Sequence, residues 1–480
     1  MPHLLSKSTF IRGQQCQKSL YLNKKRPFLR DKISSAQLAK FKRGTDVGIL
    51  AQQLFPGGID CKPKSPSQYQ KKLEETSELM NDLNVHTIYE AVFQYDDVLI
   101  MLDIIVRDNN HWKAYEVKSS RSLSQTYYTD AALQYYVING CGVILSDFCL
   151  IYVDESYVFQ EQLEINKLFK TQSVLKDVKE RLLEIKSSIA QSKLTLSLEN
   201  SPKVPIGEQC TYPYPCDFIG HCWKNIPENS FLFMSSLSPE IRFSNFTDEK
   251  STISDLPSEV LETEIQKLQF EAFKTSQIFI NESLEWTKHH SKSTVNTICF
   301  FKLLSYNPAV PFLNGMKPYS FIPVVLSYSI NELSETMFFS QTTEGFTQFI
   351  EKTEELLQSN EVIFTDDYTH FYGCHQSVLE IMDSVSPRPD KTVFTNVFDI
   401  QRLISNYNVI FPFSSKDVTL TKILKALTGE TLNLKDENYL LTDLLNSNDS
   451  TETSLLLGNL ANYTKAIKMI YNGLNKLFSN

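Results

Sequence analysis

Hydrophobic and polar positions alternate with a period of two between residues 87 and 118, the pattern of half-buried β-strands. Three such runs, TIYEAVFQY, VLIMLDIIV and WKAYEVKSS, are separated by short polar turns. Periods near 3.6 residues before and after them are typical of amphipathic helices. The sequence therefore predicts a helix–β–β–β–helix unit, with helices over 33–54, 66–83 and 122–139.

The rest of the chain is less regular. A strand is expected within 142–154, a long amphipathic helix over 160–193, and a loop rich in proline and cysteine over 201–223. A Ser-rich stretch near 235–260 has the composition of a linker, a helix is expected over 261–290, and from about 296 the pattern is mixed α/β. We therefore predict an α/β protein with a first domain at 1–230, a linker and helical connection at 231–290 and a second domain at 291–480.

Composition argues against disordered, membrane-spanning and disulfide-rich proteins. A chain of 480 residues is too long for one core, and 42% apolar with 21% charged residues is globular rather than disordered composition. No run approaches the roughly 18 apolar residues of a membrane span, and the first residues lack the features of a secretory signal. Nine cysteines, an odd number, argue against a disulfide framework. We expect a soluble cytoplasmic protein with no membrane partner.

Positive charge is concentrated at one end of an acidic chain. The net charge is -9, but residues 1–45 hold eleven Lys and Arg against the single acid Asp31. A basic segment on an acidic body is typical of a surface that faces phosphates. A solvated helix face accounts for the same residues equally well.

Two acids and a lysine interrupt the alternating strands. Glu116 and Lys118 are two residues apart and so share one face of the third strand, while Asp103 lies on the neighbouring strand. Adjacent carboxylates repel, and a divalent cation or a retained proton relieves the repulsion. Two carboxylates as hard oxygen ligands suit Mg²⁺ or Mn²⁺. Ordinary outward-facing residues of a half-solvated sheet would show the same spacing.

This arrangement resembles the PD-(D/E)XK nucleases, with Leu102-Asp103 and Glu116-Val117-Lys118 as the motif, and their RecB-like branch in particular. The resemblance implies that Asp103, Glu116 and the Val117 carbonyl hold the metal and that Lys118 assists the attacking water. It also implies that Glu90 and Gln134 position the site. Asp130 and Gln134 are four residues apart and so share one face of the following helix.

Two positions depart from the family pattern. Gly48 stands where the upstream helix usually carries a metal-binding histidine, and Ile138 stands where a tyrosine usually follows Gln134. The first departure puts metal affinity in doubt but leaves the Asp103, Glu116 and Lys118 set intact.

Four cysteines bracket these motifs: Cys16, Cys210, Cys216 and Cys222. Spacings of five residues among prolines and aromatics suit a 4Fe–4S cluster better than the CxxC pairs of zinc sites. The pattern resembles the iron–sulfur staple of the AddB-type and CRISPR-associated RecB-like nucleases. Zinc in the same site, or cysteines with no common ligand, are the alternatives.

The C-terminal half resembles a DnaQ-like exonuclease domain of ribonuclease H-like fold, which a bacterial family joins to such a nuclease. Pro308-Ala309-Val310-Pro311 and Pro318-Tyr319 fit the resemblance. Lys302 and Leu304 stand where metal-binding acids are expected, and Asp399 is the one acid that remains. Lysine would repel a metal, so we expect a catalytically inactive domain kept for packing, DNA binding or a protein partner.

These features lead to three hypotheses about function. The first is a metal-dependent DNA nuclease, with an exonuclease as the favoured mode. Its substrate would be single-stranded DNA or a DNA end, in repair, recombination or defence against foreign DNA. The second is a catalytically inactive nucleic-acid-binding or scaffold protein, and the third is an RNA nuclease. The intact Asp103, Glu116 and Lys118 set favours the first.

Overall fold

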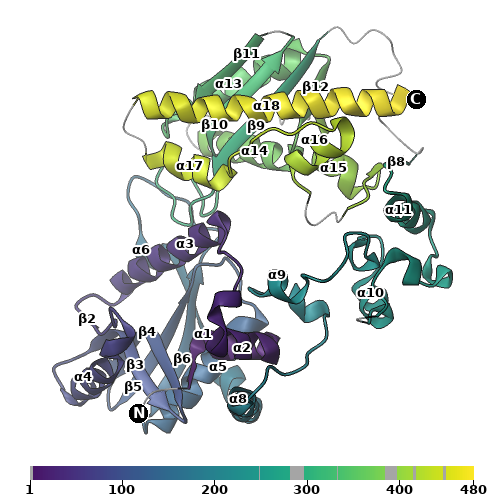
Figure 1. Cartoon of the computed structure of the whole chain (residues 1–480). Coiled ribbons are helices and arrows are strands. Elements are labelled where there is room, and N and C mark those ends of the chain that lie inside the picture. The colour runs from purple at the N-terminus through teal and green to yellow at the C-terminus, as the bar shows by residue number, and fades with distance from the viewer. Residues whose placement is uncertain are drawn as a thin grey trace. The chain divides into compact units, whose positions relative to one another are not determined.

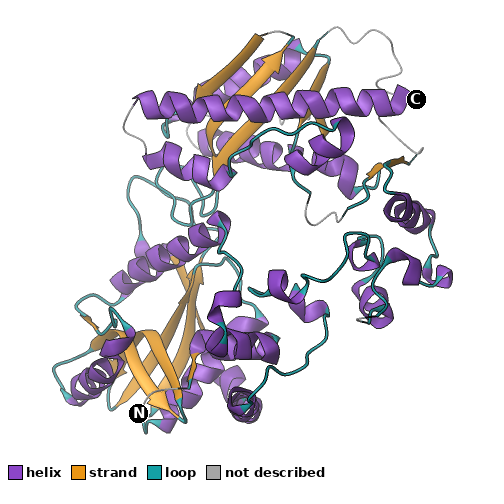
Figure 2. Cartoon of the chain, in the orientation of Figure 1, coloured by secondary structure: helices purple, strands orange, loops and turns teal. Residues whose placement is uncertain are grey.

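The computed structural model of the chain describes residues 4–247, 249–281, 297–331, 333–383, 397–413, 418–446 and 450–479. The architecture is mixed α/β, with helices flanking the sheets (Figures 1 and 2). The chain divides into two units. Unit 1 consists of Met1–Lys224 with Ala309–Phe312 and Lys317–Tyr319, and unit 2 of the remainder. Within the described ranges, no helix combines the length and apolar character needed to cross a membrane.

Unit 1 confirms the three predicted strands and the helices around them. Its strands are β1 (Leu5–Ser6), β2 (Ile59–Asp60), β3 (Thr87–Tyr95), β4 (Val98–Asp108), β5 (His111–Lys118), β6 (Leu145–Val153) and β7 (Phe169–Ser173). Its helices are α1 (Lys7–Gln15), α2 (Gln17–Lys25), α3 (Ser35–Ala51), α4 (Tyr69–Asn81), α5 (Gln125–Gly140), α6 (Ile165–Leu168), α7 (Leu175–Glu180), α8 (Leu182–Ser197) and α9 (Ile219–Cys222).

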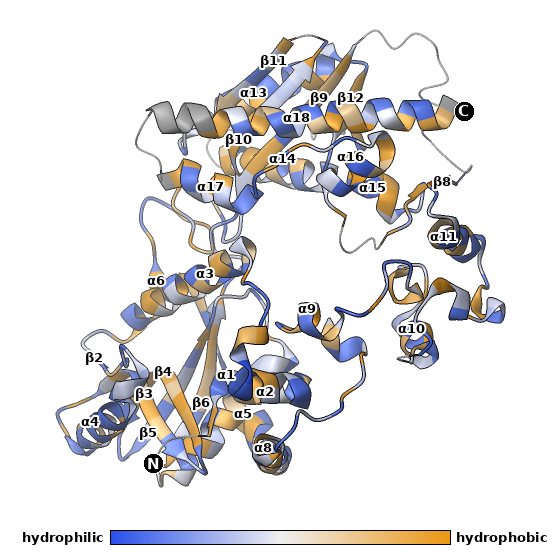
Figure 3. Ribbon diagram, viewed as in Figure 1, coloured by the Kyte–Doolittle hydropathy of each residue, from blue (hydrophilic) through white to orange (hydrophobic). Residues whose placement is uncertain are grey.

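The seven strands of unit 1 form one sheet in the order β2-β3-β4-β5-β6-β7, with β1 attached to β4. Its two faces bury different helices. Phe10 of α1 and Leu133 of α5 belong to the core on one face, and Val47 and Ala51 of α3 belong to the core on the other. With both faces covered, the strands are largely hydrophobic (Figure 3).

The sheet opens between β4 and β5 at Asp103. The β4–β5 ladder begins only at Ile104, and the first residues of β4 pair with the short strand β1 instead. The β3–β4 ladder also lacks the Glu90–Asp103 pair, and Glu90 has a φ of 51°. Positive φ is uncommon for a residue with a side chain and often marks a functional position. The strands therefore diverge around Asp103 and leave space for side chains there.

Unit 2 contains a second sheet in the order β11-β10-β9-β12-β13. The described strands of unit 2 are β8 (Phe279–Ile280), β9 (Ile298–Tyr306), β10 (Ile322–Ile330), β11 (Leu333–Phe338), β12 (Val362–Thr365), β13 (Val397–Asp399) and β14 (Val409–Ile410). Of these, β8 and β14 pair with each other in a separate two-stranded sheet. Its helices are α10 (Pro239–Asn245), α11 (Glu264–Thr275), α13 (Thr343–Ser359), α14 (Tyr368–Asp383), α15 (Ile400–Ser405), α16 (Leu420–Thr428), α17 (Glu437–Asn446) and α18 (Ser450–Ser479).

The prediction of one long helix over 160–193 is wrong. This stretch contains α6, the strand β7, α7 and the start of α8. β7 pairs with β6 and completes the edge of the sheet, so tertiary pairing overrides the local helical pattern. The expected helix over 261–290 is shorter, since α11 ends at Thr275 and β8 follows, while 282–290 lie outside the described residues.

Candidate functional site

Two acids and two lysines meet where the sheet opens. Glu116 Oε1 accepts hydrogen bonds from Lys7 Nζ at 2.6 Å and from Lys118 Nζ at 2.8 Å. Lys118 also bonds to Asp130 of α5, and Lys7 Nζ lies 3.8 Å from the same carboxylate. Only 2% of the Glu116 side chain is exposed, against 30% of the Lys7 side chain. Solvent therefore reaches this cluster on the side of Lys7.

Asp103 completes the cluster and also supports the sheet. Its Oδ2 accepts the Val117 N–H at 2.6 Å, so the carboxylate satisfies a backbone donor at the point where β4 no longer pairs with β5. Glu116 and Lys118 project from one face of β5, as their spacing predicts, because their side chains hydrogen-bond to each other. The structure thus brings together Asp103, Glu116 and Lys118.

The charges in this cluster shift one another's pKa. Burial first, and then the charge of Glu116, raise the pKa of Asp103 to about 7, although Lys7 and Lys118 oppose this. Burial would also raise the pKa of Glu116, but the two ammonium groups outweigh it and hold that pKa well below its usual range. Near neutral pH, Asp103 can therefore gain or release a proton while Glu116 stays ionised.

Two polar atoms of the cluster have no hydrogen-bond partner among the described residues. They are Glu116 Oε2 and Gln134 Oε1, and both are buried. Gln134 is fully buried on α5, and its amide nitrogen lies 3.5 Å from Asp130 Oδ1. A buried acceptor without a donor costs about 1–3 kcal/mol, so each such atom calls for an explanation. Both atoms offer lone pairs to a donor that enters the cluster.

Glu90 lies at the edge of this cluster rather than within it. Its Oε1 accepts a hydrogen bond from Lys62 Nζ at 2.6 Å. Because Tyr89 pairs with Ile104 and Ala91 with Leu102, Glu90 lies opposite Asp103 in the β3–β4 ladder. Glu90 thus lies near Asp103, as the sequence predicts, but its charge is compensated by a lysine.

Sequence reasoning missed Lys7 and Lys62. Lys7 comes from the first described residues and enters the cluster only because β1 pairs with β4, a contact that no local pattern encodes. Its position directly after a two-residue strand offers no periodic signal. Lys62 follows β2, which pairs with β3 beside Glu90.

The prediction of Mg²⁺ or Mn²⁺ bound by Asp103, Glu116 and Val117 is wrong. Over the described part of the chain, no group of three or more His, Cys, Asp or Glu side chains is placed to hold a metal ion. The physical reason is visible in the cluster, where the ammonium groups of Lys7 and Lys118 already compensate the carboxylates.

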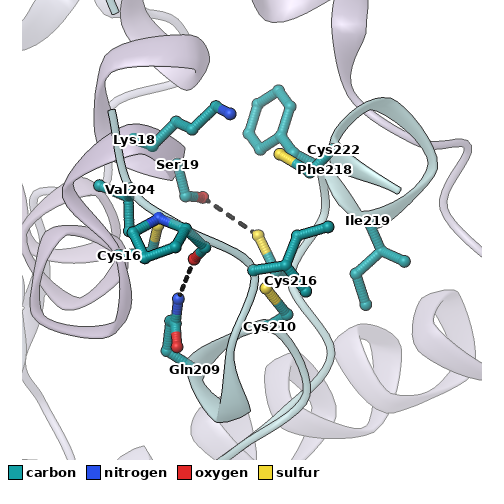
Figure 4. Close-up of a pocket in the computed structure, with 12 residues that line it drawn as sticks. Cys16, Lys18, Ser19, Val204, Gln209, Cys210, Cys216, Phe218, Ile219 and Cys222 are labelled. Carbon is teal, nitrogen blue, oxygen red and sulfur yellow. Dashed lines mark hydrogen bonds between the residues drawn. The ribbon is translucent and has the colours of Figure 1, made fainter. Parts of the chain in front are cut away.

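The prediction of a 4Fe–4S cluster, with zinc as the alternative, is also wrong. Cys16, Cys210, Cys216 and Cys222 line one pocket (Figure 4), but they form no metal-holding group among the described residues. Burial raises the pKa of Cys16 and Cys222, which favours the thiol over the thiolate that a metal requires. Cys216 Sγ instead lies 3.4 Å from the Ser19 hydroxyl.

Part of the basic N-terminal segment is structural. Arg12 donates to Asp217 at 2.7 Å, and Arg30 lies 3.5 Å from the same carboxylate. These contacts join α1 to the loop that precedes α9, and Lys7 is used in the buried cluster. Lys7, Arg12 and Arg30 therefore have structural partners that compete with a phosphate-facing role.

Unit 2 contains a separate buried cluster around Lys302 of β9. Lys302 is 4% exposed, bonds to Asp366 and donates to Glu437 Oε1 at 2.8 Å. Sequence reasoning placed Lys302 at the position of an acid but missed these two partners, which come from the end of β12 and from α17. Asp399 is buried and caps α15 by accepting the Gln401 N–H at 2.8 Å.

Comparison with known proteins adds little. No protein-family model and no curated protein matches the chain. Among solved structures, a family B DNA polymerase from the hyperthermophilic archaeon Pyrobaculum calidifontis matches 38% of this chain and 24% of its own, with 12% identity and a TM-score of 0.27. The protein SSO0001 matches 46% of this chain and 87% of its own, with 14% identity and a TM-score of 0.22. This chain thus spans about a quarter of the polymerase, and scores this low carry no argument about function.

Proposed function

We propose that the chain is a DNA nuclease and that its N-terminal unit hydrolyses phosphodiester bonds at the cluster of Asp103, Glu116 and Lys118. In this proposal unit 1 is a PD-(D/E)XK-like domain and unit 2 an inactive ribonuclease H-like domain. The observation that carries the proposal is the buried meeting of an ionised carboxylate, a carboxyl group with a pKa of about 7 and two ammonium groups.

Each group has a role that its surroundings support. Asp103 takes a proton from the attacking water, because its pKa lies near neutrality. The water oxygen bonds to phosphorus while the P–O bond to the leaving strand breaks, and the released oxygen takes its proton from solvent. Lys7 and Lys118 donate to the non-bridging oxygens as negative charge develops at phosphorus. Glu116 fixes both ammonium groups through one oxygen, and its second oxygen and Gln134 Oε1 can each accept a hydrogen bond from water.

A second candidate is a nucleic-acid-binding protein without catalysis. The observation that favours it is the pairing of Glu116 with both lysines, which neutralises the carboxylate that a nuclease would use. Under this proposal, DNA is bound and released uncut.

The test is cleavage of labelled single- and double-stranded DNA by the purified chain, with and without added divalent cations. The variants are Asp103→Asn, Lys118→Met and the control Lys179→Met, which lies exposed on α7. We expect the parent and Lys179→Met to cleave and the two site variants to lose about 100-fold or more. Equal cleavage by all four proteins would reject the nuclease proposal. Binding without cleavage by the parent would establish the second candidate.

A further inference from the structure

A loop that contains two cysteines holds the C-terminal end of α1. Gln15, the last residue of α1, donates through Nε2 to the carbonyl oxygen of Gln209 at 2.9 Å and to that of Tyr214 at 2.7 Å. These acceptors lie next to and within the segment 210–216, which begins and ends with a cysteine. The position of α1 therefore depends on this short segment.

The other end of α1 supplies a residue of the buried cluster. The helix begins at Lys7, whose Nζ lies 2.6 Å from Glu116. A helix of nine residues is only about 13 Å long, and its backbone hydrogen bonds make it move as one body. The loop that holds Gln15 and the cluster that holds Lys7 thus act on the same rigid element.

Cys210 and Cys216 have the separation that a disulfide requires. The N–H of Cys216 donates to the carbonyl oxygen of Cys210 at 2.9 Å. Residues joined by such a backbone bond have Cα atoms about 5–6 Å apart, within the range of about 4.4–6.8 Å found across disulfides. Both side chains line the same pocket, where their sulfur atoms are drawn in Figure 4. The two sulfurs can therefore be joined with little movement of the backbone.

The pocket gives a small oxidant access to these thiols. Both cysteines are half-buried, whereas Cys61 and Cys149 are buried. The cavity has a volume of about 30 Å³, roughly twice the 10–15 Å³ that one water molecule needs, so hydrogen peroxide fits. The Cys216 thiol donates to Ser19 Oγ at 3.4 Å, and because a thiol is a weak donor, little opposes the loss of this bond.

We propose that Cys210 and Cys216 form a reversible disulfide when a peroxide reaches the pocket, and that this disulfide stiffens the attachment of α1. The peroxide oxidises one thiol to a sulfenic acid and leaves as water. The second sulfur then attacks the first, the S–O bond breaks, and the hydroxyl leaves with the thiol proton as a second water. Two thiols are oxidised to one disulfide while hydrogen peroxide is reduced to two water molecules. A dithiol reverses the reaction by exchange.

The disulfide acts on α1 by restricting the loop. The link closes a ring around the five residues 211–215 and removes most of the conformations that these residues sample when the loop detaches. The carbonyl acceptors of Gln15 then stay in place, and local opening of α1 becomes rarer. Lys7 accordingly spends more time against Glu116 in the oxidised state.

The experiment compares the reduced chain with the chain treated with hydrogen peroxide. Remaining thiols are alkylated, and tandem mass spectrometry identifies the cysteines that escape alkylation. The variants are Cys210→Ser and Cys216→Ser, and the matched controls are Cys16→Ser and Cys222→Ser, because those thiols line the same pocket. Hydrogen–deuterium exchange of α1 is measured in both states of the parent, with α4, which packs against β3, as the internal control.

We expect the parent and both controls to lose two hydrogen atoms in mass and to protect Cys210 and Cys216 from alkylation. Oxidation should slow exchange in α1 by at least about 5-fold and leave α4 unchanged, and dithiothreitol should restore the faster rate. Cys210→Ser and Cys216→Ser should show neither the loss of mass nor the slower exchange.

Three outcomes would overturn the inference. Complete alkylation after peroxide treatment would show that no disulfide forms, and protection of Cys16 or Cys222 would assign it to another pair. Unchanged exchange in α1 of the oxidised parent would show that the link does not act on the helix. None of these measurements depends on DNA cleavage, so their failure leaves the proposed function as it stands.

Discussion

Replacement of Lys7 by methionine tests whether an internal ammonium group compensates the buried acids. Methionine keeps most of the length of the side chain but removes the charge. Lys7 Nζ lies 2.6 Å from Glu116 and 3.8 Å from Asp130. The variant therefore leaves two carboxylates with Lys118 as their remaining close cation among the described residues.

The size of the effect follows from these distances. With an effective dielectric constant of about 20, unit charges attract by roughly 6 kcal/mol at 2.6 Å and roughly 4 kcal/mol at 3.8 Å. Burial of the ammonium group costs several kcal/mol, and Lys118 still holds both acids, so most of this attraction is cancelled. We expect a net loss of about 2–3 kcal/mol in the free energy of unfolding of unit 1.

The assay is urea unfolding at neutral pH, followed by tryptophan fluorescence. The control is Lys42→Met, which breaks an exposed pair with Asp46 at 2.8 Å and should cost less than about 0.5 kcal/mol. Glu116→Gln added to Lys7→Met should recover part of the loss, since it removes the uncompensated charge. If Lys7→Met costs no more than Lys42→Met, the ammonium group does not compensate the acids and the reasoning is refuted.

Three further predictions concern other parts of the chain. Cleavage by the parent should increase as the pH rises through about 7, because Asp103 accepts a proton only when ionised, and Asp103→Asn should show no such step in a pH–rate profile. Lys302→Met should lower the free energy of unfolding of unit 2 by about 3 kcal/mol, because Asp366 would stay buried without its cation. Adding Asp366→Asn should recover part of this loss in urea unfolding, and an unchanged urea midpoint for Lys302→Met would contradict the buried pair. Gly345→Ala should lower the melting temperature, since the new Cβ would lie 2.1 Å from the Ser340 carbonyl oxygen; an unchanged melting temperature would show that the backbone adapts freely.

Sequence reasoning succeeded where a local pattern decides the structure. The strands β3, β4 and β5 follow from alternation of period two, and the shared face of Glu116 and Lys118 follows from their spacing. The helix that carries Gln134 lies at Gln125–Gly140, close to the predicted range of 122–139. These features needed no knowledge of distant contacts.

The missed features all depend on contacts between distant segments. Lys7 reaches Glu116, 109 positions away, only because β1 pairs with β4. With Lys7 left out of account, the neighbouring carboxylates of Asp103 and Glu116 imply a metal ion. The prediction of Mg²⁺ or Mn²⁺ failed for that reason. Lys302 likewise finds Glu437 from 135 positions away. A sequence alone shows which charges exist, but the compensation of a charge is a property of the fold.

The divergence of the strands at Asp103 has a practical meaning for mutagenesis. The same carboxylate that would take up a proton also accepts the Val117 N–H through Oδ2, so reactivity and strand geometry share one side chain. Alanine at this position would release the amide and loosen β5 as well as remove the acid. Asparagine keeps an acceptor for the amide, and therefore only that substitution separates chemistry from architecture.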